Sequence, residues 1–155
     1  MAFAENRNVI SALVDYQRAL DVYDYMDKYY KIQHHELLVR IAICYDILGN
    51  YQRTMDYLTI AMKLVPNICN LVLYKSVLYY ANGDHAKGIR LLNKFKTLSV
   101  GLGKENLFEL FRLVFNYVEG GSKKKLIDEL TVMLNDKTKR YALAYYLKAI
   151  IYLEI

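Results

Sequence analysis

The residues that could carry chemistry in this chain of 155 residues include three histidines. His34, His35 and Glu36 stand next to one another, but adjacent side chains on a helix point about 100° apart and cannot share a metal ion. His85 follows a Gly-Asp pair, where its ring is expected to pack at a turn. The histidines therefore predict no metal site.

The cysteines and glycines also lack a catalytic pattern. Cys44 and Cys69 stand in apolar helical contexts without a CxxC spacing, which favours two reduced core thiols over a disulfide framework. Gly101 and Gly103 lack the third glycine of a dinucleotide fingerprint and the GK[ST] of a P-loop, so they predict a flexible connection. No serine or cysteine has a paired base at a recognisable spacing. We expect neither enzymatic activity nor a bound cofactor.

The composition points to an all-helical intracellular protein. It is 55% hydrophobic with one proline, and a net charge of +5 is too small for a dedicated nucleic-acid binder. Glu5 and Arg7 interrupt the region where a signal peptide needs an apolar run. The apolar stretch Tyr141 to Ile155 contains Lys148 and is too short to cross a bilayer. We therefore expect a nuclear or cytoplasmic protein without nucleic-acid or membrane partners.

The elements that position these residues are revealed by an internal repeat. When the sequence is shifted by 34 residues, small residues fall on small ones, aromatic on aromatic, and glycine on glycine. The superposed pairs are Ala42 and Ser76, Tyr45 and Tyr79, Gly49 and Gly83, Asn50 and Asp84, Thr54 and Gly88, and Leu58 and Leu92.

This period and these residue types are typical of the tetratricopeptide (TPR) family, which the chain resembles. Ala42 and Thr54 are small where two helices would cross closely, with Tyr45, Leu58 and Leu64 filling the space around the crossing. Gly49 would end the first helix. The residues of the first unit that carry the resemblance are Leu38, Ile41, Ala42, Tyr45, Gly49, Thr54, Leu58, Ala61 and Pro66.

The resemblance implies an all-α fold, a right-handed superhelix of antiparallel helix pairs (a TPR-like α-solenoid) in one domain over 1–155. Its last repeat would be incomplete, so that either a partner covers the last helix or, as we favour, the chain is the N-terminal piece of a longer protein. We place the turn of the first pair near Gln17 to Leu20. The predicted elements are a helical pair over 8–34, repeats over 35–68 and 69–98, a degenerate pair over 105–135 and a lone helix over 140–155.

Sixteen tyrosines are unusual for a chain of this size. Neighbouring tyrosines on a helix cannot all face one core, so some of them are candidates for a partner surface, with core packing as the alternative. The candidate interface residues are Tyr23, Tyr25, Tyr29, Tyr30, Tyr80, Tyr145 and Tyr146.

Charge is unevenly distributed along the sequence. Residues 121 to 140 hold six basic and three acidic residues, whereas residues 1 to 36 hold six acidic and four basic ones. The lysine run Lys123 to Lys125 is read either as a solvated helix start or as a surface complementary to an acidic partner or to another copy of the chain.

A closer resemblance covers residues 12 to 64, which are similar to the cell division cycle protein 27 family of scaffold subunits in the anaphase-promoting complex (cyclosome). It implies a homodimerising half of a subunit of this cell-cycle ubiquitin ligase, in contact with other subunits. A peptide-binding TPR adaptor, of the co-chaperone or organelle-fission type, is the alternative. The matching residues are Ala12, Leu13, Tyr16, Tyr29, Glu36, Leu37, Ala42, Cys44, Tyr45 and Gly49.

Overall fold

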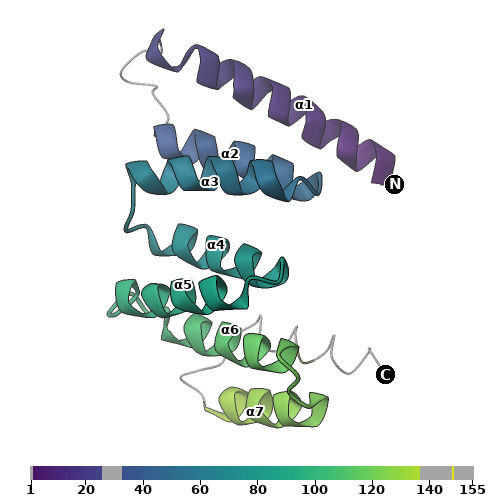
Figure 1. Cartoon of the computed structure of the whole chain (residues 1–155), viewed down its shortest axis with the longest axis vertical. Coiled ribbons are helices and arrows are strands. Elements are labelled where there is room, and N and C mark those ends of the chain that lie inside the picture. Colours follow the sequence, from purple (N-terminus) through teal and green to yellow (C-terminus); the bar gives the residue numbers. More distant parts are fainter. Residues whose placement is uncertain (1, 26–32, 137–147, 149–155) are drawn as a thin grey trace. The chain divides into compact units, whose positions relative to one another are not determined.

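The computed structural model describes residues 2–25, 33–136 and 148, and this part of the chain is all-helical (Figure 1). None of its helices is both long and apolar enough to span a membrane. The helices are α1 (Ala2–Asp21), α2 (His34–Ile47), α3 (Tyr51–Leu64), α4 (Cys69–Ala81), α5 (His85–Leu98), α6 (Glu105–Val118) and α7 (Lys123–Asn135), with a short 3₁₀ turn, η1 (Tyr23–Tyr25), after α1.

The chain divides into two compact units, Met1–Leu78 and Tyr79–Ile155, where the sequence predicted one domain. The boundary falls within α4. Each unit has its own apolar core, as expected for parts that bury their apolar faces internally. The predicted lone helix over 140–155 lies outside the described residues, apart from Lys148, which is helical.

One buried cluster of the first unit lies between α1 and α2. Leu13 of α1 packs with Leu37, Ile41 and Cys44 of α2 in one buried cluster. The helix α3 runs back beside α2 (Figure 1), and Leu58 is buried on its inner side. The helix α2 therefore packs its apolar residues against both α1 and α3.

The predicted turn near Gln17 to Leu20 is wrong, because α1 continues without interruption to Asp21. The segment holds no glycine or proline, and its residues are good helix formers. Val9, Leu13, Tyr16 and Leu20 all belong to the cluster against α2, so one apolar stripe favours one long helix.

Two polar contacts join the first part of α4 to the helix pair before it. The Tyr74 hydroxyl donates to Asp46 Oδ2 at 2.7 Å, which connects α4 to α2. Lys75 Nζ donates to Thr59 Oγ1 at 2.9 Å, which connects α4 to α3. Burial, with the hydrogen bond and charge of Asp46, raises the pKa of Tyr74. The phenol therefore stays protonated and keeps donating at neutral pH.

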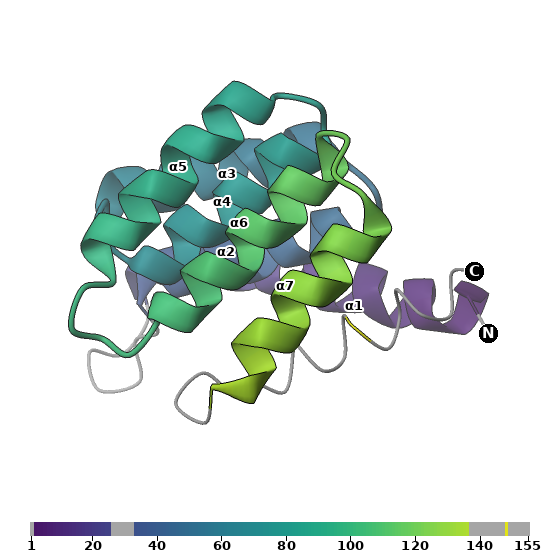
Figure 2. The same ribbon diagram turned by 90° about the horizontal axis from the view of Figure 1, so that it is seen from below.

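The second unit is built on α6 and α7, which lie side by side in both views (Figures 1 and 2). Between them lies a cluster of buried leucine and methionine side chains, and the partly buried Tyr117 and Ile127 pack against it. The helix α5 packs on the other side of α6. The buried members of the cluster are Leu110, Leu113, Leu126, Leu130, Met133 and Leu134.

The turns after α2 and α4 have the same backbone geometry. Gly49 has φ +75° and donates to Asp46 O at 2.9 Å, while Asn50 N donates to Tyr45 O at 2.8 Å. Gly83 has φ +90° and donates to Tyr80 O at 3.1 Å. Asp84 N donates to Tyr79 O at 2.9 Å. Both turns are therefore Schellman motifs that end one helix and begin the next.

The residue that closes each of these turns also caps the following helix. The side chain of Asn50 accepts from Arg53 N at 3.1 Å, and that of Asp84 accepts from Lys87 N at 3.2 Å. Each satisfies one of the free N–H groups of a first helical turn. Lys87 Nζ lies 2.9 Å from Asp84 Oδ2, and this contact lowers the pKa of the Asp84 carboxyl.

The turn after α6 is one residue longer than the turns after α2 and α4. Gly120 and Gly121 make the same two bonds, to Tyr117 O at 3.1 Å and Asn116 O at 3.2 Å, but the helix cap is one residue later, at Ser122. A side chain at Gly121 would bring its Cβ to 2.9 Å from Asn116 O. One extra residue is thus accommodated only because it is glycine.

Candidate interaction surfaces

The residues assigned to repeat packing are mostly buried. Ala42 and Thr54 have no exposed surface, and Thr54 Oγ1 donates to Asn50 O at 2.9 Å. Leu64 differs from the prediction, because half of its surface is exposed at the end of α3. Tyr45 and Tyr79 are half-buried, Gly49, Gly83 and Pro66 are exposed at chain turns, and Leu38, Ile41, Leu58, Ala61, Ser76, Gly88 and Leu92 are buried.

The candidate interface tyrosines are placed in very different surroundings. Tyr25 is 89% exposed, whereas Tyr23 is half-buried and stacks on His34 with ring centroids 4.6 Å apart. Tyr80 is only 4% exposed and belongs to the interior of the second unit, not to an open surface. The remaining candidates, Tyr29, Tyr30, Tyr145 and Tyr146, lie outside the described residues.

Tyr80 stands in a stack of three rings. Its ring lies 3.8 Å from Phe115 and 4.2 Å from His85, with small angles between the planes. Its hydroxyl donates to Phe115 O at 2.6 Å. His85 Nδ1 is 3.8 Å from Glu119 Oε1. The stack connects the start of α5 with the end of α6, so the histidine packs at the turn.

The surroundings of Tyr80 predict a loss of stability at alkaline pH. Burial, together with the nearby negative charge of Glu119, raises the pKa of Tyr80 to about 12. A tyrosine in an unfolded chain has a pKa near ~10, so between these values the unfolded state binds fewer protons and stability falls as pH rises.

Denaturant unfolding of the wild type and of Tyr80→Phe checks this prediction. The wild type should lose its advantage over the variant as pH rises through this window, because only the wild type has the buried phenol to ionise. A stability difference that stays constant over the window would contradict the prediction.

No catalytic constellation is evident in the part of the chain that the structure describes. It holds no group of three or more His, Cys, Asp and Glu residues placed to bind a metal ion. Cys44 and Cys69 are buried and do not form a disulfide, and burial raises the pKa of the Cys44 thiol. A raised pKa keeps the Cys44 sulfur protonated and poorly nucleophilic.

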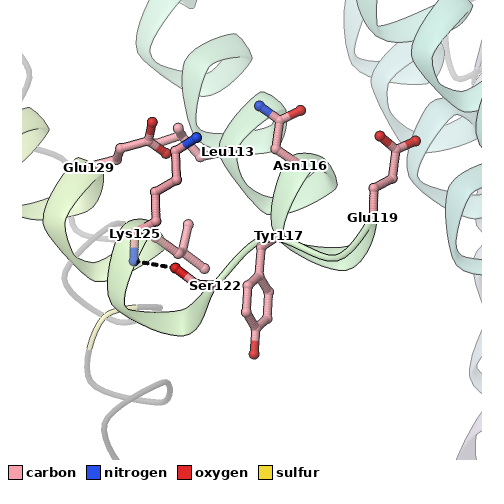
Figure 3. Close-up of a pocket in the computed structure, with 9 residues that line it drawn as sticks. Leu113, Asn116, Tyr117, Glu119, Ser122, Lys125 and Glu129 are labelled. Atoms are coloured by element: carbon pink, nitrogen blue, oxygen red, sulfur yellow. Dashed lines mark hydrogen bonds between the residues drawn. The ribbon is translucent and has the colours of Figure 1, made fainter.

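A pocket at the turn between α6 and α7 contains the end of the lysine run (Figure 3). Lys125 and Glu129 extend from α7, and Glu119 lies at the end of α6. Ser122 Oγ accepts from the backbone N–H of Lys125 at 3.1 Å. The serine therefore acts as a helix cap, and the pocket offers charged side chains without an activated nucleophile.

The exposed side of α2 lies between two grooves of the first unit. One groove, between α1 and α2, includes Val9, Arg40, Ile43 and Ile47. The other, between α2 and α4, is called here the α2–α4 groove. Both contain Arg40 and the exposed Ile43. The residues of the α2–α4 groove are His35, Glu36, Val39, Arg40, Ile43, Ile68 and Leu71.

The sequence interpretation missed these isoleucines because it followed only the buried stripe of the repeat. Ile43 and Ile47 are four residues apart and lie on the side of α2 opposite Leu38 and Ala42. A pair of large apolar residues on the polar side of a predicted helix was the available signal. Exposed apolar side chains of this kind mark interaction surfaces.

A further groove lies between α5 and α6 in the second unit. It combines Lys96 of α5 with Glu105 and Arg112 of α6, and Val100 of the connecting loop lies at its edge. Lys96 Nζ is 5.0 Å from the ring centroid of Phe108. The loop glycines have φ values of +76° at Gly101 and +69° at Gly103, so they shape a defined turn.

The described part of the chain is thus an all-helical protein whose surface carries apolar and charged grooves. Comparisons with protein-family models, with curated proteins and with solved structures returned no match.

Proposed function

We propose that the chain is a non-enzymatic scaffold module whose TPR-like helix pairs stack into a right-handed superhelix and join two copies of the chain. The repeated turn carries this proposal: Gly49 and Gly83 share a left-handed conformation and the same two bonds, 34 residues apart. Recurrence of one supersecondary unit at a fixed period is typical of solenoids.

The particular assembly that we propose is the anaphase-promoting complex, a cell-cycle ubiquitin ligase of the nucleus and cytoplasm. The chain would be the homodimerising N-terminal part of a subunit like cell division cycle protein 27, in contact with other subunits. The sequence resemblance around Cys44, Tyr45 and Gly49 supports it. Neither nucleic acid nor a membrane is part of this proposal.

Sedimentation velocity over a concentration series tests the scaffold proposal. We expect a dimer at micromolar concentration, and small-angle scattering should give the elongated particle of a solenoid. A monomer at tens of micromolar would count against homodimerisation. A compact globular particle would instead contradict the superhelix.

A peptide-binding adaptor is the second candidate, favoured by the α2–α4 groove. This groove offers apolar contact at Val39, Ile43 and Ile68, with Arg40 beside them. A hydrophobic segment lying along such a groove would gain affinity from its apolar anchors.

Peptides selected from a random library on the purified chain test this candidate. We expect Ile43→Asp to weaken binding of a selected peptide by about tenfold or more, because the charge would stand in the groove. Ile60→Asp, an exposed isoleucine of α3 outside the groove, is the matched control. Equal affinity for both variants would place binding elsewhere.

A further inference from the structure

The loop between α5 and α6 presents two large apolar side chains to solvent. Val100 is 75% exposed and Leu102 is 58% exposed. The loop is held in place, because Leu102 N donates to Ser99 O at 3.0 Å and Ser99 itself is buried. A fixed turn that exposes two apolar side chains is a suitable centre for a contact.

The groove beside this loop carries both signs of charge. Lys96 lies on its α5 side, and Glu105, Glu109 and Arg112 lie on its α6 side. Neither Lys96 nor Glu105 forms an ion pair within the residues that the structure describes. The two opposite charges thus line one groove without neutralising each other.

The mixed charge decides which kind of partner fits. An anionic bilayer or a nucleic acid would be attracted by Lys96 and Arg112 but repelled by Glu105 and Glu109. A two-fold contact between identical chains needs a self-complementary patch, in which residue i meets residue j of the other copy and the reverse. An apolar centre flanked by both basic and acidic side chains meets that requirement.

We propose that this patch, made of Val100 and Leu102 with Lys96 and Glu105, is a two-fold contact between two copies of the chain. Val100 and Leu102 pack against their counterparts, and Lys96 of each copy faces Glu105 of the other. The inference rests on the proposed homodimerisation and names the surface that produces it.

Substitution of the apolar centre is the first test, read by sedimentation equilibrium. The double variant Val100→Ser and Leu102→Ser should raise the dimer dissociation constant by about tenfold or more, because the anchors are lost. Val132→Ser is the control, since Val132 is 71% exposed on α7, outside the patch. Both variants should keep the wild-type circular dichroism.

Charge reversal is the second test and reports which residues face each other. Lys96→Glu and Glu105→Lys should each weaken the dimer, because like charges would meet across the axis. The combined variant should restore it, since both pairs are then opposite again. A structural defect would not be repaired in this way.

The outcomes separate the inference from the function on which it rests. A dimer that none of these variants weakens would overturn the inference and leave homodimerisation standing. A chain that is monomeric throughout would overturn both. A monomer that cosediments with phosphatidylserine vesicles, and loses this binding in the serine variant, would overturn the two-fold contact in favour of a membrane surface.

Discussion

Leu58→Ala is expected to lower the free energy of unfolding by about 2–5 kcal/mol, because it removes a fully buried side chain and leaves a cavity. Leu58 has no exposed surface and is one of the buried residues of α3 in the first unit. Domains of this size have total stabilities of about 5–15 kcal/mol, so the loss would be a large fraction of the whole.

Leu64→Ala is the matched control, because it makes the same substitution on the same helix at a residue that is 50% exposed. We expect a much smaller loss there, about 1 kcal/mol or less. Urea unfolding monitored by circular dichroism measures both variants. Equal losses at the two positions would contradict the difference in burial between Leu58 and Leu64.

Gly83→Ala is expected to cost about 1–2 kcal/mol, through the backbone alone. Gly83 has φ +90°, a conformation that side chains disfavour, yet a Cβ placed there would meet nothing within 4 Å. The loss therefore measures the left-handed turn and not a clash. Gly49, with φ +75° and the same open space, should respond alike.

The asparagine variant separates turn strain from other causes. Gly83→Asn should cost less than Gly83→Ala, because asparagine tolerates the left-handed region better than alanine. Thermal or denaturant unfolding of both variants gives the comparison. If alanine is tolerated as well as asparagine, the left-handed turn is not what constrains position 83.

The all-helical fold and the turns of the repeat could be predicted from sequence because their causes are local. Gly49 and Asn50 stand within a few residues of the groups that they contact, and the same holds for Gly83 and Asp84. The wrong prediction of a turn within α1 also has a local cause. No glycine was present near Gln17, and the apolar stripe continued to Leu20.

The candidate surfaces were harder to predict because exposure depends on distant parts of the chain. Val100 and Leu102 could be read as loop residues, but their outward position depends on Ser99 being buried and on α6 packing beside α5. Ile43 is exposed because α2 buries its opposite side against α1 and α3. Such facts follow from neighbours far away in sequence.

The sequence by itself determined where α2 and α4 end and where α3 and α5 begin, since a left-handed glycine and a capping side chain act over a single turn. Only the tertiary structure decided which tyrosines are inside. Tyr79 and Tyr80 are neighbours of the same type, yet Tyr80 alone is enclosed, by Phe115 from a helix 35 residues further along. Burial is a property of the packed chain, which a residue's own neighbours in sequence do not encode.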